Sequence, residues 1–212
     1  MTKREFLKSE VLKGLSEKLL PYHFILKKSS SEFLKKTTDG WFSYIPVFLT
    51  RDEGWEINPT MGIRINHVEE IYHITSGFEK KYQKGTPTIG ISIENFISDR
   101  KEHRFILTRE DHVDQVIAGL FDLFEEFALS FYEDHSSVEA VDKALNEDPS
   151  DTSLTGAIFK GSKGIILARL TKRSNYSDLV NIYTKHYQQL ADGFYLADFM
   201  RLIEELALAK YA

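Results

Sequence analysis

A long β-hairpin is the clearest element that the pattern of hydrophobic and polar positions predicts. Apolar side chains dominate residues 41–49, which favours a first strand with both faces covered. After a turn signal at residues 52–54, apolar and polar residues alternate from Trp55 to Asn66, as in a strand with one buried face. Gly54 is expected to supply the positive φ that a tight hairpin turn needs. The pattern therefore predicts two long antiparallel strands.

Shorter strands on either side of the hairpin complete the predicted sheet. The pattern indicates four of them, at residues 23–28, 32–36, 88–93 and 104–107. The last two are expected to pair with each other, and together with the hairpin the strands form an antiparallel meander of five or six strands. Pro46 and Pro59 cannot donate a ladder hydrogen bond, so bulges or edge positions are expected there.

Helices are predicted for most of the remaining chain. Residues 3–20 form an amphipathic helix that Pro21 ends. The strongest helical pattern runs from about residue 108 to residue 132, and its first four residues, 108–111, resemble a capping box. Four phenylalanines of this helix are expected to cover the aromatic face of the sheet: Phe121, Phe124, Phe127 and Phe131. Further helices are predicted at residues 67–76, 136–146, 154–170, 179–190 and 194–206, although residues 154–170 would also suit a strand.

The order of these elements predicts an α+β fold. An N-terminal helix precedes the antiparallel meander, and the helix-rich C-terminal half is expected to pack on the sheet. A polar break at residues 147–151 suggests a boundary. Residues 1–146 would form the sheet domain with its covering helices. Residues 152–212 would form a C-terminal helical subdomain, packed on the first domain as one unit.

The charge of the chain is unevenly distributed. The net charge is −5, yet residues 109–151 contain two basic residues against 13 acidic ones. Such a block repels nucleic acid and attracts a partner with a basic surface. A solvated helix face explains the same pattern without any partner. The candidate partner-binding residues are five acidic residues of the long predicted helix: Asp111, Asp114, Asp122, Glu125 and Glu126.

No motif for catalysis or for a cofactor is complete. The absence of cysteine excludes disulfides, thiolate catalysis and cysteine-ligated metals. The glycine-rich segment 156–164 lacks a lysine directly after its second glycine, which a P-loop requires. Glu70 and His73 have the spacing of a di-iron ligand pair, but such a site needs a second copy of the pair, and the sequence contains one. We therefore predict no catalytic residue, no cofactor and no metal.

Two function classes remain. The first is a protein-binding module without enzymatic activity, which uses the acidic helix to hold a basic partner. The alternative is an enzyme or small-ligand binder with a pocket between the sheet and the C-terminal helices. In that case the polar groups of the pocket would be His67, Glu70, His73 and the tyrosines.

The first 66 residues have a recognisable order of elements. A helix from residue 3 leads into the strand Tyr22-His23-Phe24-Ile25-Leu26-Lys27, and the strand Phe33-Leu34-Lys35-Lys36 and the long aromatic hairpin follow. This order resembles uncharacterised bacterial α+β domains of the immunity-protein-like kind, some of which accompany polymorphic toxins. The resemblance implies a small cytoplasmic protein that binds a protein partner, and it assigns no residue a role.

The sequence also bears on the compartment. No apolar run approaches the roughly 18 residues of a membrane span. The N-terminal residues lack the apolar core of a signal peptide. With the absence of cysteine, these features predict a cytoplasmic protein that has no membrane segment.

Overall fold

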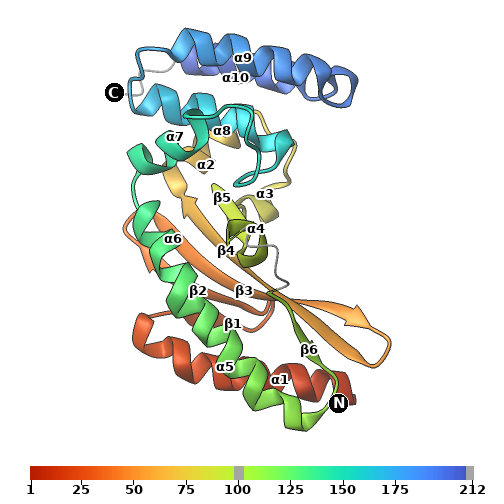
Figure 1. Cartoon of the computed structure of the whole chain (residues 1–212). Coiled ribbons are helices and arrows are strands. Elements are labelled where there is room, and N and C mark those ends of the chain that lie inside the picture. The colour runs from red at the N-terminus through yellow and green to blue at the C-terminus, as the bar shows by residue number, and fades with distance from the viewer. Residues whose placement is uncertain (98–102, 209–212) are drawn as a thin grey trace. The chain divides into compact units, whose positions relative to one another are not determined.

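The computed structural model describes residues 1–97 and 103–208 and has a mixed α+β fold (Figure 1). In these ranges the α-helices are α1 (Lys3–Leu19), α2 (Asn66–Tyr72), α3 (Lys80–Gln83), α4 (Ile93–Ile97), α5 (Val113–Leu123), α6 (Leu129–Asp134), α7 (Val138–Asn146), α8 (Ala157–Leu170), α9 (Tyr176–Gln189) and α10 (Leu196–Leu208). The strands are β1 (Ile25–Lys27), β2 (Glu32–Thr37), β3 (Gly40–Arg51), β4 (Gly54–Ile65), β5 (Ile89–Ser92) and β6 (Phe105–Leu107). Short 3₁₀ segments are η1 (Leu20–Tyr22), η2 (Glu110–His112) and η4 (Leu190–Gly193), and η3 (Phe124–Ala128) is a π turn. The predicted fold class is confirmed: an N-terminal helix, an antiparallel sheet and a helix-rich second half.

The chain divides into two compact units, each built from two separate segments of the sequence. The first unit comprises Met1–Ile63 and Gly90–Glu133, and the second comprises Arg64–Ile89 and Asp134–Ala212. Most of the sheet belongs to the first unit, together with α1, α5 and most of α6. The break predicted at residues 147–151 lies in the second unit, between α7 and α8. That residues 152–212 form a separate subdomain stays a prediction.

The sheet has the order β1-β2-β3-β4-β5, and β6 also pairs with β4. β1 and β2 are antiparallel, with Ile25 opposite Leu34. β2 and β3 are antiparallel as well, with Phe33 opposite Tyr44, and a two-residue turn joins them. The predicted meander from β1 to β4 is therefore present.

The partner predicted for the last strand is wrong. The sequence suggests that residues 104–107 pair with residues 88–93, but β6 pairs with β4, with Leu107 opposite Trp55. β4 has twelve residues and β5 has four, so β5 leaves part of the edge of β4 open. β6 fills the portion nearest the hairpin turn.

Each proline of the hairpin lies outside the paired stretch of one neighbouring short strand. Pro46 follows Tyr44, which is the last residue of β3 that pairs with β2. Pro59 lies beyond Ile57, where the pairing of β4 with β6 ends. The expected edge position is confirmed for Pro46: β2 does not pair with β3 at this residue, so no hydrogen bond to β2 needs the N–H that proline lacks.

The long helical run after β6 packs on the sheet through residues spaced four apart. Leu120, Phe124, Ala128 and Tyr132 are all buried. An α-helix has 3.6 residues per turn, so a spacing of four slowly rotates such a stripe away from the sheet. The π turn η3 has wider i→i+5 bonds, which compensate for this rotation and keep the stripe facing the sheet.

Two buried tyrosine hydroxyls join this run to β3. Tyr44 donates to the backbone oxygen of Leu120 at 2.7 Å, and Tyr132 donates to that of Ser43 at 2.7 Å. The expected packing of the phenylalanines is confirmed in part. Phe124 and Phe131 are fully buried, whereas Phe121 and Phe127 are half-buried.

The capping box expected at residues 108–111 is absent. The run starts with the 3₁₀ segment η2, whose N-cap Arg109 makes no side-chain capping bond, and α5 begins at Val113. The Asp111 carboxylate lies 3.1 Å from the guanidinium of Arg109 instead of capping the backbone. A complete capping box occurs on α1, where Thr2 Oγ1 accepts from the N–H of Glu5 and the Glu5 carboxylate accepts from the N–H of Thr2.

The second unit consists largely of helices (Figure 1). The helix favoured for residues 154–170 is confirmed by α8, and the predicted helical hairpin is formed by α9 and α10. The chain reverses at η4, where Ala191 and Asp192 take φ values of 48° and 52°. None of the helices in the described ranges is long and apolar enough to cross a membrane.

Gly54 begins β4, but not for the reason that the sequence suggests. Positive φ values among the glycines occur at residues 40, 156 and 193, so the prediction for Gly54 is wrong. A Cβ atom at Gly54 would lie 2.2 Å from the backbone oxygen of Leu107. The glycine is therefore needed because β6 approaches β4 closely at this point.

We predict that Gly54→Ala lowers the free energy of unfolding by about 1–3 kcal/mol, because the backbone of β6 must move. Urea unfolding measures the change. Gly77→Ala is the matched control, since no atom lies within 4 Å of the added Cβ and φ is not positive there. The control is expected to change stability by about 0.5 kcal/mol or less. Equal effects of the two substitutions would contradict the close approach of β6.

Candidate functional site

The five predicted partner-binding residues all lie in the first unit, on the helical run from η2 to η3. Each of them is exposed: Asp111, Asp114, Asp122, Glu125 and Glu126. At 100° per residue, these positions fall within about 120° of one another around an α-helix. They therefore share one side of the run, opposite the residues that pack on the sheet. We call these five residues the acidic face.

Two members of the acidic face are held by neighbouring side chains. Glu125 accepts a hydrogen bond from the hydroxyl of Tyr22, and Asp111 pairs with Arg109. The side chains of Arg109 and Asp111 are both more than half exposed, so this pair adds little to stability. Neither contact removes the negative charges from the surface.

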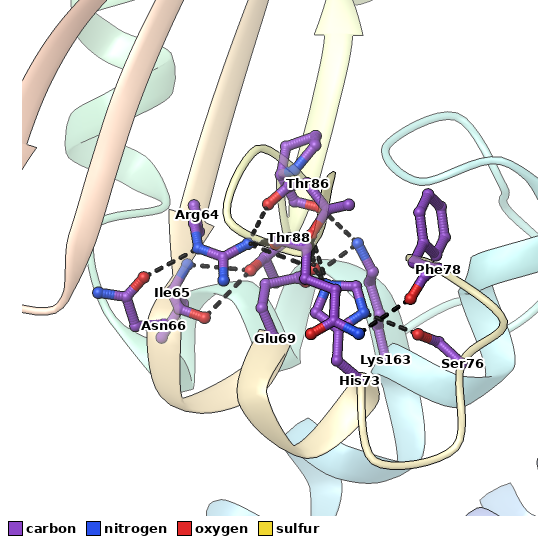
Figure 2. A network of polar contacts seen from close by, with 12 residues as sticks. Arg64, Ile65, Asn66, Glu69, His73, Ser76, Phe78, Thr86, Thr88 and Lys163 are labelled. Carbon is purple, nitrogen blue, oxygen red and sulfur yellow. Dashed lines mark hydrogen bonds and ion pairs between the residues drawn. The ribbon is translucent and has the colours of Figure 1, made fainter. Parts of the chain in front are cut away.

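A second candidate is a buried polar network in the second unit, centred on Glu69 of α2 (Figure 2). The Glu69 side chain is fully buried, and its carboxylate lies 3.0 Å from Lys163 Nζ and 3.8 Å from Arg64 Nη1. The pair with Lys163 is an ion pair by distance, without the angle of a hydrogen bond. The side chains of Arg64 and Lys163 are 6% and 5% exposed. Two cations from separate segments thus meet one carboxylate in the interior.

Thr86 links the carboxylate to His73. The Thr86 hydroxyl donates to Glu69 Oε2 at 2.6 Å, and its oxygen lies 2.8 Å from His73 Nε2. The Thr86 hydroxyl has one proton and donates it to Glu69. In the bond between Thr86 and His73, the proton is therefore on His73 Nε2. His73 Nδ1 then accepts from the hydroxyl of Ser76 at 2.7 Å. Both ring nitrogens are satisfied by a neutral imidazole.

Burial shifts the proton affinity of two groups in the network. It lowers the pKa of His73 below the usual 6.5, although the charge of Glu69 opposes this shift. Burial also lowers the pKa of Lys163, again against the effect of Glu69. Lys163 Nζ lies 5.5 Å and 5.4 Å from the ring centroids of Tyr72 and Phe159, and it donates to the backbone oxygen of Pro87. The lysine is thus surrounded by rings and a carbonyl.

The Arg64 guanidinium also donates to backbone oxygens and to one side-chain oxygen. Arg64 Nη1 donates to the backbone oxygens of Gln83 and Thr86, at 2.8 Å and 2.6 Å, and Arg64 Nε donates to Asn66 Oδ1. A carboxylate, an imidazole and a lysine with a lowered pKa are the groups of an acid–base site. Here, however, each of them is directed at another group of the protein. Within the second unit, the arrangement joins residues 64–65 at the end of β4, α2, residues 83–87 and α8.

The structure does not bring together the polar groups named for a pocket. His67 and Glu70 are exposed, while the His73 side chain is 5% exposed and faces Glu69. The acidic neighbour of His73 is Glu69, four residues before it, and not Glu70. The sequence reasoning missed Glu69, Arg64 and Lys163. A weak signal existed for Glu69, since the i,i+4 spacing places it beside His73 on a helix.

The glycine-rich segment 156–164 forms the start of α8 and no phosphate loop. Its glycines allow α9 to approach closely. A Cβ atom at Gly161 would lie 2.6 Å from the ring of Tyr187, and one at Gly164 would lie 2.8 Å from the ring of Tyr183. The two glycines are therefore explained by helix packing in the second unit.

Comparisons with other proteins add no assignment. No family model matches the chain, and no curated protein and no solved structure gives a significant match. In the described part of the chain, no group of three or more His, Asp or Glu side chains is placed to hold a metal ion.

We predict that Glu69→Ala lowers the free energy of unfolding by about 3–5 kcal/mol, because Lys163 and Arg64 lose the buried carboxylate. Glu70→Ala is the matched control on the exposed side of the same helix and is expected to cost about 0.5 kcal/mol or less. Chemical denaturation of both variants measures the difference. If Glu70→Ala is as costly as Glu69→Ala, the assignment of Glu69 to the interior is wrong.

We also predict that His73 makes stability depend on pH. The unfolded chain binds the His73 proton near pH 6.5, whereas the folded protein binds it only at lower pH. Between the two pKa values the unfolded state holds more protons, so the free energy of unfolding rises with pH. This contribution is complete above about pH 6.5 and is lost as the pH falls through the folded pKa.

The measurement is urea unfolding of the wild type and of His73→Gln between about pH 5 and pH 7. The variant should lose part of the increase in stability with pH. Identical slopes for the wild type and His73→Gln would show that His73 does not contribute.

Proposed function

We propose that this protein is a binding module without enzymatic activity, and that the acidic face holds a partner protein with a basic surface. The observation that supports it best is the π turn η3, which carries Glu125 and Glu126 at the C-terminal end of the face. π turns within α-helices often occur at functional positions. In this run the turn keeps Phe124 and Ala128 buried while the two glutamates remain exposed.

The backbone beneath the acidic face is already ordered. The Tyr44 hydroxyl of the sheet donates to the helical run, and the Tyr132 hydroxyl of the run donates to the sheet. Phe124 of the run is fully buried. A partner therefore orders few additional backbone torsions when it binds, which reduces the entropic cost of association. The charges of the face also accelerate the encounter with a basic protein, and this acceleration decreases as salt increases.

The resemblance of residues 3–66 to immunity-protein-like domains is in keeping with this proposal. In such a case the partner is a toxin whose basic surface the acidic face covers. Because the chain has no cysteine, the proposal places the encounter in a reducing cytoplasm.

We predict that neutralising the acidic face weakens partner binding by about tenfold or more. The variant combines Asp114→Asn, Asp122→Asn and Glu126→Gln, three exposed residues that form no salt bridge with the rest of the described chain. Loss of complementary charge at close range costs more than about 1.4 kcal/mol, which corresponds to tenfold in affinity. Proteins captured from a native cell lysate at low and at moderate salt are compared by quantitative mass spectrometry.

The control variant removes three exposed negative charges from the second unit: Asp192→Asn, Glu204→Gln and Glu205→Gln. A basic protein that the wild type and the control retain, that the acidic-face variant loses and that moderate salt releases would support the proposal. A partner retained equally by both variants, or no retained protein at all, would refute it.

A further inference from the structure

The outer edge of β3 is only partly covered by a neighbouring strand. β2 pairs with β3 from Gly40 to Tyr44, whereas β3 continues to Arg51. In the described ranges no strand pairs with this side of residues 45–51. β2 begins only at Glu32, because the preceding residue, Ser31, has a φ of 59° and belongs to the turn between β1 and β2. The seven residues 45–51 therefore have no paired strand on this side, and seven residues is within the usual length of a strand.

The register identifies the backbone groups that face outward. Thr37 and Gly40 are paired and flank a two-residue turn, the position at which paired residues exchange hydrogen bonds. Counting in steps of two along β3, the same edge carries the carbonyl of Pro46 and both backbone groups of Phe48 and Thr50. Pro46 has no N–H to lose at this edge.

Contacts connect the N-terminal helix α1 to this part of the hairpin. At the hairpin tip, Arg4 Nη2 donates to the backbone oxygen of Arg51 at 2.6 Å, and Trp55 Nε1 donates to that of Arg4 at 3.0 Å. Lys8 of α1 lies 4.9 Å from the ring centroid of Phe48. A strand added here would meet a backbone that is already extended.

The two faces beside this edge differ in chemistry. Val47 and Leu49 are 36% and 37% exposed, and side chains alternate along a strand, so they lie on the face opposite Phe48. On the Phe48 side, a hollow of about 660 Å³ lies between α1 and the β1–β2 segment. Its charged lining residues are Glu5, Lys8, Lys13, Glu17 and Lys28.

The charge around the hollow favours an acidic occupant. Three lysines line it against two glutamates, and the Glu5 carboxylate is engaged in the capping box of α1. Residues 1–37 as a whole contain nine basic residues against four acidic ones. Pairing of this edge with the same edge of a second copy would bring like charges together, which opposes self-association.

We propose that an extended acidic segment of a partner protein adds to the open edge of β3 as an antiparallel strand. Its backbone bonds to Pro46, Phe48 and Thr50. The side chains on one face of the added strand are acidic and meet the lysines of the hollow. Those on the other face are apolar and meet Val47 and Leu49, so that alternate side chains give the specificity of strand addition. This surface is separate from the acidic face and opposite in charge, so either proposal can fail without the other.

The probe is a capped peptide of about eight residues with alternating glutamate and valine, a length that covers the open edge. Fluorescence anisotropy of the labelled peptide gives its Kd, and amide hydrogen exchange of the full chain reports the site. We expect saturable binding that slows exchange at the amides of Phe48 and Thr50. A lysine–valine peptide of equal length should bind at least tenfold more weakly.

Two pairs of variants test the geometry. Thr50→Pro removes an outward N–H at an exposed position and should raise the Kd at least tenfold, whereas Thr50→Ala should change it less than twofold. Lys13→Glu with Lys28→Glu should also weaken binding at least tenfold, and the control Lys143→Glu with Lys185→Glu, exposed residues of the second unit, should not.

Three outcomes would overturn the proposal. The first is that the glutamate–valine peptide does not bind. The second is that Thr50→Pro binds it as the wild type does. The third is protection of the Phe48 and Thr50 amides that increases with protein concentration when no peptide is present, because the edge would then be an interface between copies of the chain.

Discussion

The alternation of side chains along β3 and β4 is the constraint on which the first unit depends. Tyr44 and Phe48 lie on the face of β3 that meets the helices, and Tyr44 bonds to the backbone oxygen of Leu120. A shift of one residue in the pairing would turn these side chains to the other face and separate the sheet from α1 and α5. The short turns at residues 38–39 and 52–53 prevent this shift, since each leaves no spare residue. Helix packing and the position of the acidic face both follow from this register.

The sequence predicted the elements that have a clear period and failed where a contact joins distant short segments. The hairpin, α1 and the helical run after β6 each repeat their pattern over many residues. β6 has three residues, which is too few to show a period or to indicate a partner. The role of Gly54 depends on that same contact with Leu107, so it was equally hidden. The four residue types at 108–111 matched a cap, but nothing in the motif indicates that Asp111 pairs with Arg109.

The candidate sites were predictable to different degrees. Exposure of the acidic face follows from helical periodicity, because its residues lie opposite the apolar stripe. The Glu69 network was only partly accessible from the sequence. At 100° per residue, Glu69 lies about 60° from the buried Tyr72, whereas Glu70 lies about 160° away, so a helical projection alone favours Glu69 as the buried acid. Its partners Arg64 and Lys163 come from other segments, and no local pattern connects them.

The two surfaces proposed for the first unit differ in what they offer a partner. The acidic face is a helix surface and presents only side chains, because its backbone groups are bonded within the run. Its contribution to affinity is therefore electrostatic and decreases with salt. The edge of β3 presents backbone groups, whose hydrogen bonds depend much less on ionic strength, and salt would act there mainly through the lysines of the hollow. A partner that joins a basic surface to an acidic extended segment would engage both surfaces at once. The second contact would then form at a high effective concentration, so a modest affinity at each surface would suffice for a stable complex.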